Sequence, residues 1–195
     1  MKKIFIAVCI FIFSESNLQA QSFSTGNLVT NIGTGFISFY GFSHLGQFGK
    51  PFGLPAISIS AEQGYKPLGP GILGIGGSLG FKEGGFHYDP SHYSNIAYNE
   101  NWSAITLAPR VTYHPDKFNT EKYEVYGSLQ LGLRYFTYKN SYYESISQTA
   151  RYNSLSPFFS LIAGGRYYLN SNIAVFAEVG YDIAFMKLGV ALKLK

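Results

Sequence analysis

The sequence predicts an all-β fold, an eight-stranded antiparallel up-and-down β-barrel that crosses a membrane. The first observation is composition: 46% of the 195 residues are hydrophobic and 17% aromatic, whereas only 13% are charged and soluble domains carry about 25%. The second is a widespread period-2 alternation of apolar and polar residues, which is the period of a strand. The third is an alternation of short turns with long loops, which is typical of transmembrane barrels.

The first 20 residues are expected to form a signal peptide, separate from a barrel domain at residues 21–195. Lys2 and Lys3 precede an apolar run at residues 4–13, and Leu18-Gln19-Ala20 resembles a cleavage site. The run is too short to span a bilayer, which needs about 20 apolar residues. The single cysteine, Cys9, leaves with this segment, so the mature chain is expected to lack disulfides and thiolate chemistry.

Four predicted strands lie in the first part of the mature chain, at residues 28–39, 56–65, 72–82 and 103–113. The fourth shows the alternation well, because Ile105, Leu107 and Val111 share one parity while Thr106 and Arg110 share the other. Pro109 lies inside this strand, where it removes one hydrogen bond from the ladder and weakens the prediction.

Four more predicted strands follow, at residues 123–135, 155–169, 173–182 and 186–194. In the first of them Leu129, Leu131 and Leu133 alternate with polar and small residues, and Glu124 and Arg134 share the polar parity. The two C-terminal strands repeat this pattern. The connections at residues 66–71, 114–122 and 170–172 are short and rich in turn residues, and the last connection, near residues 183–184, is tight. Those at residues 40–54, 83–101 and 139–153 are long.

The apolar parity is predicted to face lipid, rather than to fill the centre as in a soluble lipocalin-like barrel. In strands with two charges, such as Glu124/Arg134 and Lys187/Lys193, both charges share one parity, which is crowded with Gly, Ser and Ala. A lipid-facing Lys or Arg near the bilayer midplane would cost roughly 2–4 kcal/mol. Tyrosines mark strand ends on the apolar parity, as in a girdle: Tyr65, Tyr113, Tyr123, Tyr135, Tyr167 and Tyr181.

The charged parity then predicts an inward network of six cations and four anions. A barrel of about eight strands is just filled by its own side chains, so we expect ion pairs to plug the lumen. The predicted network is Glu62, Lys82, Arg110, Glu124, Arg134, Arg166, Glu178, Asp182, Lys187 and Lys193.

The pattern resembles the small eight-stranded outer-membrane barrels of Gram-negative bacteria, of the OmpA/OmpX type. The resemblance rests on residues 31–35 (NIGTG), 129–135 (LQLGLRY), 177–181 (AEVGY) and 187–190 (KLGV), and it covers roughly residues 28–195. It implies an outer-membrane location, a lipid environment and delivery to the barrel-insertion machinery. Many such proteins end in an aromatic residue, whereas this chain ends Leu192-Lys193-Leu194-Lys195.

One segment looks catalytic. His92-Tyr93-Ser94-Asn95 is similar to the His/Ser motif of lipid A deacylases, in which a histidine activates a serine nucleophile. Glu100 could orient the histidine. The motif lies in a long loop, whereas that family carries it on a late strand, so an exposed loop is the favoured interpretation.

No metal site or cofactor is predicted. His44, His87, His92 and His114 show no ligand spacing, and exposed loop histidines explain them better. The glycine-rich segments at residues 69–71 and 74–77 precede no helix, so they are not phosphate loops. A net charge of +4 lacks the Lys/Arg density of a nucleic-acid binder.

The sequence therefore favours a non-enzymatic, OmpA-like outer-membrane protein with a plugged lumen and a structural or surface-recognition role. Its long loops are rich in Tyr, Ser and Asn, which suits adaptable binding of an extracellular ligand. The alternatives are a lipid A-modifying enzyme that uses His92 and Ser94, or a narrow channel. A soluble secreted barrel is the structural rival.

Overall fold

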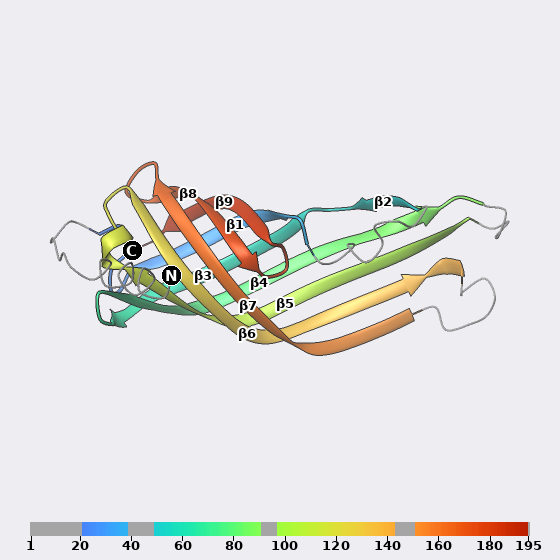
Figure 1. Ribbon diagram of the computed structural model, residues 1–195, viewed down its shortest axis with the longest axis horizontal. Coiled ribbons are helices and arrows are strands. Elements are labelled where there is room, and N and C mark those ends of the chain that lie inside the picture. The colour runs from blue at the N-terminus through green and yellow to red at the C-terminus, as the bar shows by residue number, and fades with distance from the viewer. Residues whose placement is uncertain (1–20, 39–48, 91–96, 143–150, 195) are drawn as a thin grey trace, which may run out of the picture.

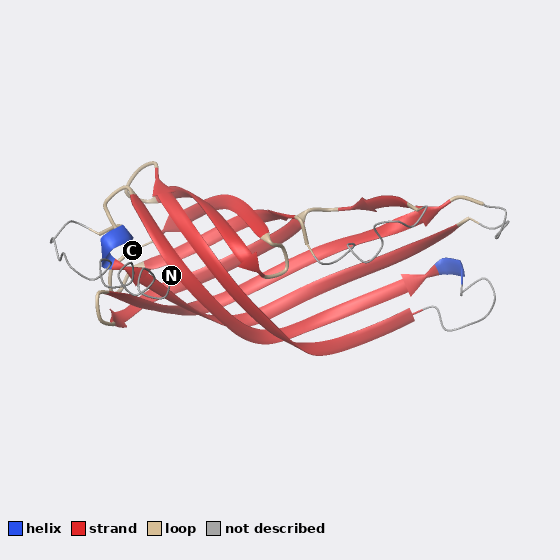
Figure 2. Ribbon diagram, in the orientation of Figure 1, coloured by secondary structure: helices blue, strands red, loops and turns tan. Residues whose placement is uncertain are grey.

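The computed structural model describes residues 21–38, 49–90, 97–142 and 151–194, and nearly all of these lie in strands (Figure 2). The described residues form nine strands and a short 3-10 helix, and residues 141–142 are also helical. The elements are β1 Leu28–Phe36, β2 Lys50–Gly53, β3 Ala56–Pro67, β4 Gly71–Tyr88, β5 Tyr98–Pro115, η2 Asp116–Phe118, β6 Tyr123–Asn140, β7 Arg151–Tyr168, β8 Ile173–Tyr181 and β9 Met186–Lys193.

Eight of the strands close into a ring. Each strand from β3 to β9 pairs antiparallel with the next along the chain, and β1 closes the ring by pairing with both β3 and β9. The predicted eight-stranded antiparallel barrel is therefore confirmed. The ninth strand, β2, lies outside the ring and pairs only with the far end of β4.

The start of β1, the end of β9 and the short turns lie at one end of the barrel (Figure 1). β1 begins at this end, and residues 68–70, η2 and residues 170–172 connect strands there. We call this end the terminal end. It is the periplasmic end in the topology that the short turns predict.

The barrel is much taller on one side than on the other. β4, β5, β6 and β7 have 18 residues each, whereas β1, β8 and β9 have eight or nine. The outer halves of the long strands, with β2 beside them, project past the ring as a protruding sheet (Figure 1). The sequence predicted a long loop at residues 83–101. Residues 83–88 and 98–101 instead belong to β4 and β5, which pair with each other over 18 residues.

Pro109 lies inside β5, as predicted, and the ladder with β6 is interrupted there. The register runs from Leu107↔Leu133 to Arg110↔Gln130, with no pairs between them. Gly132 faces this gap, and a Cβ at that position would lie 2.1 Å from the carbonyl oxygen of Leu107. A residue without a side chain is therefore needed where the two strands approach each other closely.

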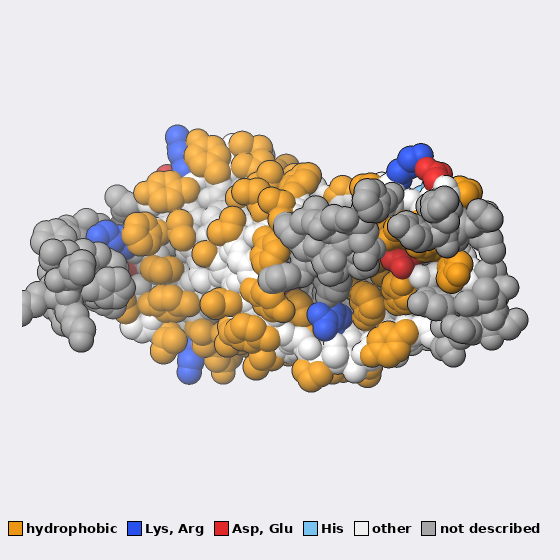
Figure 3. Space-filling view, turned by 45° about the vertical axis from the view of Figure 1, so that its right-hand side comes forward, with side chains coloured by type: hydrophobic (Ala, Val, Ile, Leu, Met, Phe, Trp, Pro, Cys, Tyr) orange, Lys and Arg blue, Asp and Glu red, His pale blue; other side chains and the backbone are white. Residues whose placement is uncertain are grey.

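The apolar parity faces outward, as predicted. Leu129, Leu131 and Leu133 are 42%, 60% and 53% exposed, and the girdle residues Tyr123 and Tyr135 are 46% and 45% exposed. In the space-filling view hydrophobic side chains cover the visible barrel wall, and charged side chains cluster near its end and on the protruding part (Figure 3). In water so large an exposed apolar surface would drive association, so this wall is suited to lipid.

About 12 residue steps separate Tyr123 from Tyr135. At about 3.3 Å per residue and a tilt of about 40°, they cover roughly 30 Å, close to an apolar band of about 25 Å. Among the described residues, no helix has the length and hydropathy to cross a bilayer.

Candidate functional site: buried charge network and protruding sheet

The interior of the barrel holds ionised side chains that are almost completely shielded from solvent. Each is at most 4% exposed, and each lies on the parity opposite to the lipid-facing leucines. They are Glu62 on β3, Arg110 on β5, Glu124 on β6, Arg166 on β7, Glu178 on β8 and Lys187 on β9. Because burying an unpaired charge costs several kcal/mol, the contacts of these groups decide whether the barrel is stable.

Arg166 joins two carboxylates that are far apart in the sequence. Its Nη2 and Nη1 atoms donate to Glu62 and Glu124, and its Nε donates to Asn31 Oδ1 at 2.9 Å. The guanidinium also lies 4.5 Å from the centre of the Tyr126 ring. One side chain thus links strands β1, β3, β6 and β7 across the lumen.

A second group of charges lies further from the terminal end. Arg110 Nη2 donates to Glu178 Oε1 at 2.7 Å, and the Tyr126 hydroxyl donates to the same oxygen at 2.9 Å. Lys187 Nζ contacts Glu178 Oε2 at 2.7 Å and also pairs with Asp182. Tyr126 lies between the two groups, because its ring is also 5.5 Å from the Arg110 guanidinium.

The other predicted network residues lie at the margins. Asp182 follows β8 in the turn to β9, and its side chain is 7% exposed. Arg134 donates from Nε and Nη2 to Ser156 Oγ at 3.3 and 3.2 Å, in the part-buried wall of the protruding sheet. Lys82 is half-buried on β4. Lys193 Nζ donates to the Ser22 carbonyl at 2.8 Å.

His114 was expected to be an exposed loop histidine, and this expectation is wrong. β5 continues to Pro115, so the side chain points into the lumen, where it is 0% exposed. Its Nδ1 lies 3.5 Å from Glu124 Oε2, and its Nε2 lies 3.8 Å from Glu62 Oε2. The sequence did contain a signal for this orientation. His114 has an even number, as Arg110 does, and the even-numbered side chains of this strand point inward.

Of the other histidines, His44 and His92 lie outside the described residues, as does Ser94. His87 is on β4, where Nδ1 lies 2.6 Å from Asn99 Oδ1 and Nε2 lies 3.3 Å from Asp89. In the part of the chain that the structure describes, no three His, Cys, Asp or Glu side chains are grouped so that they could hold a metal ion.

Glu100, the weak catalytic alternative, lies on β5 in the protruding sheet. Asn140 Nδ2 donates to its Oε1 at 2.9 Å, and the Tyr88 hydroxyl donates to its Oε2 at 3.4 Å. These contacts belong to a polar and aromatic wall that crosses β4, β5 and β6.

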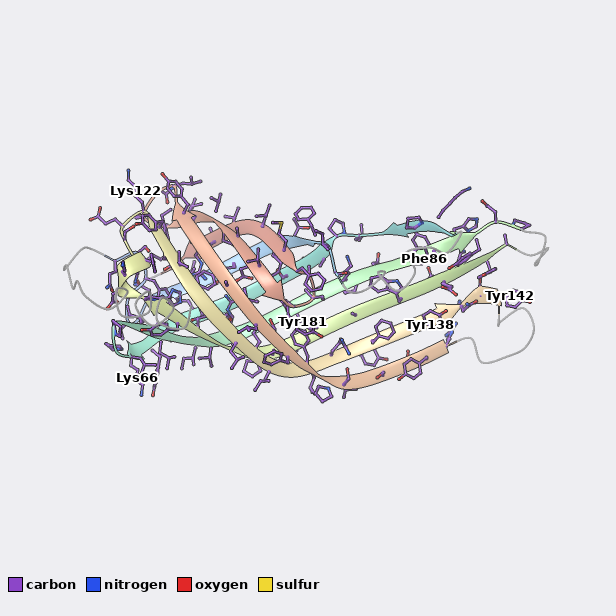
Figure 4. All side chains as sticks on the ribbon, viewed as in Figure 1. Lys66, Phe86, Lys122, Tyr138, Tyr142 and Tyr181 are labelled. Atoms are coloured by element: carbon purple, nitrogen blue, oxygen red, sulfur yellow. The ribbon has the colours of Figure 1, made fainter. Side chains whose placement is uncertain are left out.

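Aromatic side chains gather on this protruding sheet. Tyr88 stacks on Tyr98 with centroids 4.5 Å apart, and Tyr98 packs against Tyr142 at 5.4 Å. Phe86, Tyr138 and Tyr142 lie along the part that projects away from the termini, whereas Lys66 and Lys122 mark the terminal end (Figure 4). Aromatic and amide groups on rigid strands are the chemistry of a recognition surface.

The two lateral edges of the protruding sheet differ in whether a further strand covers them. On one side β2 pairs with β4, from Lys50↔His87 to Gly53↔Gly84. On the other side, β8 pairs with β7 only over residues 161–168. No described strand pairs with residues 151–160 of β7 on the side away from β6. Leu155 pairs with the girdle residue Tyr135, and residues 152–154 pair with β6 beyond it. Residues 152–155 therefore form a strand edge at and beyond the girdle that no described strand covers.

The closed ring, the apolar wall and the buried ion pairs together define the class of protein. The chain has the architecture of a small eight-stranded transmembrane β-barrel. In hydrocarbon every backbone polar group needs an internal partner, and for strands only a closed ring provides one.

No protein-family model matches the sequence, and no curated protein sequence matches it either. Among solved structures, the chain is similar to Ail, the attachment invasion locus protein of Yersinia pestis, in complex with the heparin analogue sucrose octasulfate. The identity is 13%, the TM-score is 0.49, and 87% of this chain and 95% of that chain are covered. A second structure of Ail matches with 10% identity, a TM-score of 0.43 and the same coverage. At these values the likeness supports no statement about ligand or activity.

Proposed function

We propose that this chain is a non-enzymatic outer-membrane protein that recognises a partner protein with its protruding sheet. The observation that carries the proposal is the edge of β7 that no described strand covers, which we call the open edge. β2 covers the opposite edge of the same sheet, so the difference between the two edges lies in the fold itself. An uncovered strand edge pairs with an extended segment of another chain.

The expected partner segment is an extended peptide that adds a strand beside residues 152–155, at and beyond the tyrosine girdle. Main-chain hydrogen bonds would supply much of the affinity. Side chains at the edge would supply selectivity, since Tyr152 and Leu155 are 59% and 65% exposed. This deepens the expectation of surface recognition and places it on a rigid strand rather than in a loop.

Pro157 indicates which amides face the open edge. It pairs with Leu133 across the β6 ladder, and a proline is tolerated in a strand where its missing N–H faces away from the partner strand. Residues of the same parity, such as Asn153 and Leu155, then direct their amides toward the open edge.

The test uses the barrel in lipid nanodiscs, probed with an array of linear peptides from surface proteins. We expect peptide binding that Asn153→Pro weakens by about tenfold or more, because one edge donor is lost. Asn153→Ala keeps the backbone donor and is the matched control. Peptide binding that survives Asn153→Pro, or an array without any binder, would overturn the proposal.

Three further features complete the proposal. Cleavage after Ala20 removes the signal peptide, and the mature chain enters the outer membrane through the barrel-insertion machinery. The ion pairs around Arg166 and Glu178 plug the lumen, because Arg166–Glu62 and Arg110–Glu178 join strands that are not neighbours in the ring. The lumen then serves stability rather than transport.

A further inference from the structure

The mouth of the barrel at the terminal end is covered by the chain's own N-terminal segment, residues 21–27, which we call the lid. Phe23 is 0% exposed, and its ring stacks on the His114 imidazole with centroids 3.9 Å apart and an interplanar angle of 17°. The lid therefore lies directly against the buried charge network.

Backbone hydrogen bonds hold the lid in place. Asn119 Oδ1 accepts from the Phe23 amide and the Ser22 hydroxyl, both at 3.0 Å, and Asn119 Nδ2 donates to the Phe23 carbonyl at 2.6 Å. The Ser22 amide donates to Thr120 at 2.9 Å. Gly64 lets the lid approach β3, since a Cβ there would lie 2.2 Å from the Ser24 carbonyl oxygen.

The groups that face His114 come from several elements. Glu62 of β3 and Glu124 of β6 lie on its two nitrogens at 3.8 and 3.5 Å. Thr112 of β5 is 3.1 Å from Nε2, and the Tyr126 ring is 5.3 Å away. The cations nearest to these carboxylates are Arg166, which pairs with both, and Arg110, whose Nε is 3.8 Å from Glu62. The Tyr168 hydroxyl donates to Glu124 at 3.4 Å.

The charges of this network do not balance without His114. Among the described residues, four carboxylates have side chains at most 7% exposed, and three Lys or Arg side chains are equally shielded. The carboxylates are Glu62, Glu124, Glu178 and Asp182, and the cations are Arg110, Arg166 and Lys187. A protonated His114 is the fourth cation, and it lies between the two carboxylates at the terminal end.

We propose that His114 is held as an imidazolium between Glu62 and Glu124, and that this charge locks the N-terminal lid over the mouth of the barrel. Both ring nitrogens then carry a proton, and the positive charge lies within ion-pair distance of a carboxylate on each side. The charged ring has a fixed orientation, which presents a flat face for Phe23 to stack on. When His114 loses its proton, Glu62 and Glu124 lose a nearby positive charge and the lid loosens.

This device goes beyond the proposed recognition function, because it operates at the opposite end of the barrel from the protruding sheet. It also gives residues 21–27 a role immediately after the predicted cleavage point. The lid is a regulatory contact, and pH is the variable that acts on it.

The first test needs no variant. The His114 ring nitrogens are measured by ¹⁵N NMR on the complete mature chain in nanodiscs at pH 7. The expected result is the shift pair of an imidazolium, with both nitrogens protonated. A neutral imidazole at pH 7 would refute the proposal.

The second test measures hydrogen-exchange protection of the Ser22 and Phe23 amides, which report directly on the lid. His114→Gln is expected to lower both protection factors by about 10- to 100-fold, because Glu62 and Glu124 lose a cation. The amide of Leu131 in the membrane wall is the internal reference and is expected to change little.

The double variant His114→Gln/Glu124→Gln separates charge from packing. Removing one carboxylate restores the balance, so protection of the lid is expected to recover by about tenfold relative to His114→Gln. If His114 acts only as a stacking partner for Phe23, the double variant protects the lid no better, and the proposal is wrong. Asn119→Ala should loosen the lid while the His114 nitrogens keep their charged signature.

Discussion

At the scale of single residues, the barrel depends on how each buried charge is paired. Arg166 contacts Glu62, Glu124 and Asn31 with three different nitrogens, so the geometry uses the planar fork that arginine offers and lysine lacks. A buried pair need not stabilise more than a hydrophobic one would, but breaking it leaves an uncompensated charge. The penalty for losing one partner is therefore the quantity to measure.

We expect Arg166→Gln to lower the free energy of unfolding by about 3–5 kcal/mol, because Glu62 and Glu124 lose their shared cation. Urea unfolding in detergent, followed by the mobility of folded and unfolded forms on gels, gives the midpoint. Lys122→Gln removes an exposed cation at the terminal end and should leave the midpoint nearly unchanged. Equal midpoints for the two variants would show that the buried pairing contributes little.

On the outer wall, position along the membrane normal decides the cost of a charge. Leu131 lies near the middle of the apolar band, between Tyr123 and Tyr135, so Leu131→Arg is expected to destabilise the inserted barrel by roughly 2–4 kcal/mol. Leu169 is also exposed, at 63%, but follows β7 at the terminal end. Leu169→Arg should cost at most about 1 kcal/mol. Folding yields into lipid vesicles compare the two, and similar losses would contradict a depth-dependent wall.

At the scale of elements, the long strands carry the surface that distinguishes this barrel. The ring needs only the inner half of each 18-residue strand, and the outer halves form a sheet with one edge covered by β2. β2 is held beside β4 partly by an ion pair between Lys50 of β2 and Asp89, which follows β4, since Lys50 Nζ lies 2.7 Å from Asp89 Oδ2. The hydrogen bond from Lys50 lowers the pKa of the Asp89 carboxyl below its ordinary 3.8.

This pairing has a definite pH dependence. A lowered pKa in the folded state means that the contribution is complete above about pH 3.8 and is lost as the pH falls below it. We expect the Asp89 carboxyl carbon to titrate below 3.8 by NMR, and to move toward 3.8 in Lys50→Gln. Lys66→Gln, a change at the opposite end of the molecule, serves as the control. An unshifted titration in Lys50→Gln would assign the effect to another group.

At the scale of the whole molecule, the closed ring separates the interior from the exterior, so the two surfaces can differ in polarity. The exterior can be apolar because hydrocarbon surrounds it, and the interior can be charged because each buried ion lies beside an opposite charge. The chain has a single cysteine, at position 9, so no disulfide can form within it. The barrel therefore relies on this pairing and on its ring of backbone hydrogen bonds.

A barrel filled in this way should not conduct. We expect the purified chain to show no stable single-channel conductance in planar bilayers, and to migrate faster on gels before heating than after it. A conductance that changes in Glu178→Gln would instead favour the narrow-channel alternative. Recovery of the protein in the aqueous phase without detergent would contradict the membrane assignment.

Composition and period determined much of this molecule from the sequence alone. The alternation of Leu129, Leu131 and Leu133 with polar residues set both the strand and its outward face, because a two-residue period has only two possible orientations. The same parity predicts that Glu124 and Arg166 point inward. These are local properties, so one strand at a time was enough to find them.

Other features depended on how the strands meet. His114 follows Tyr113 at what looked like the start of a turn, and only the length of β5 places it in the lumen beside Glu62 and Glu124. The lid and the open edge of β7 are likewise set by partners distant in the chain. The sequence by itself determined which side of each strand meets lipid, because that depends on local periodicity. The tertiary structure alone decided which charges pair and which edge stays open, because those depend on strand length and register around the ring.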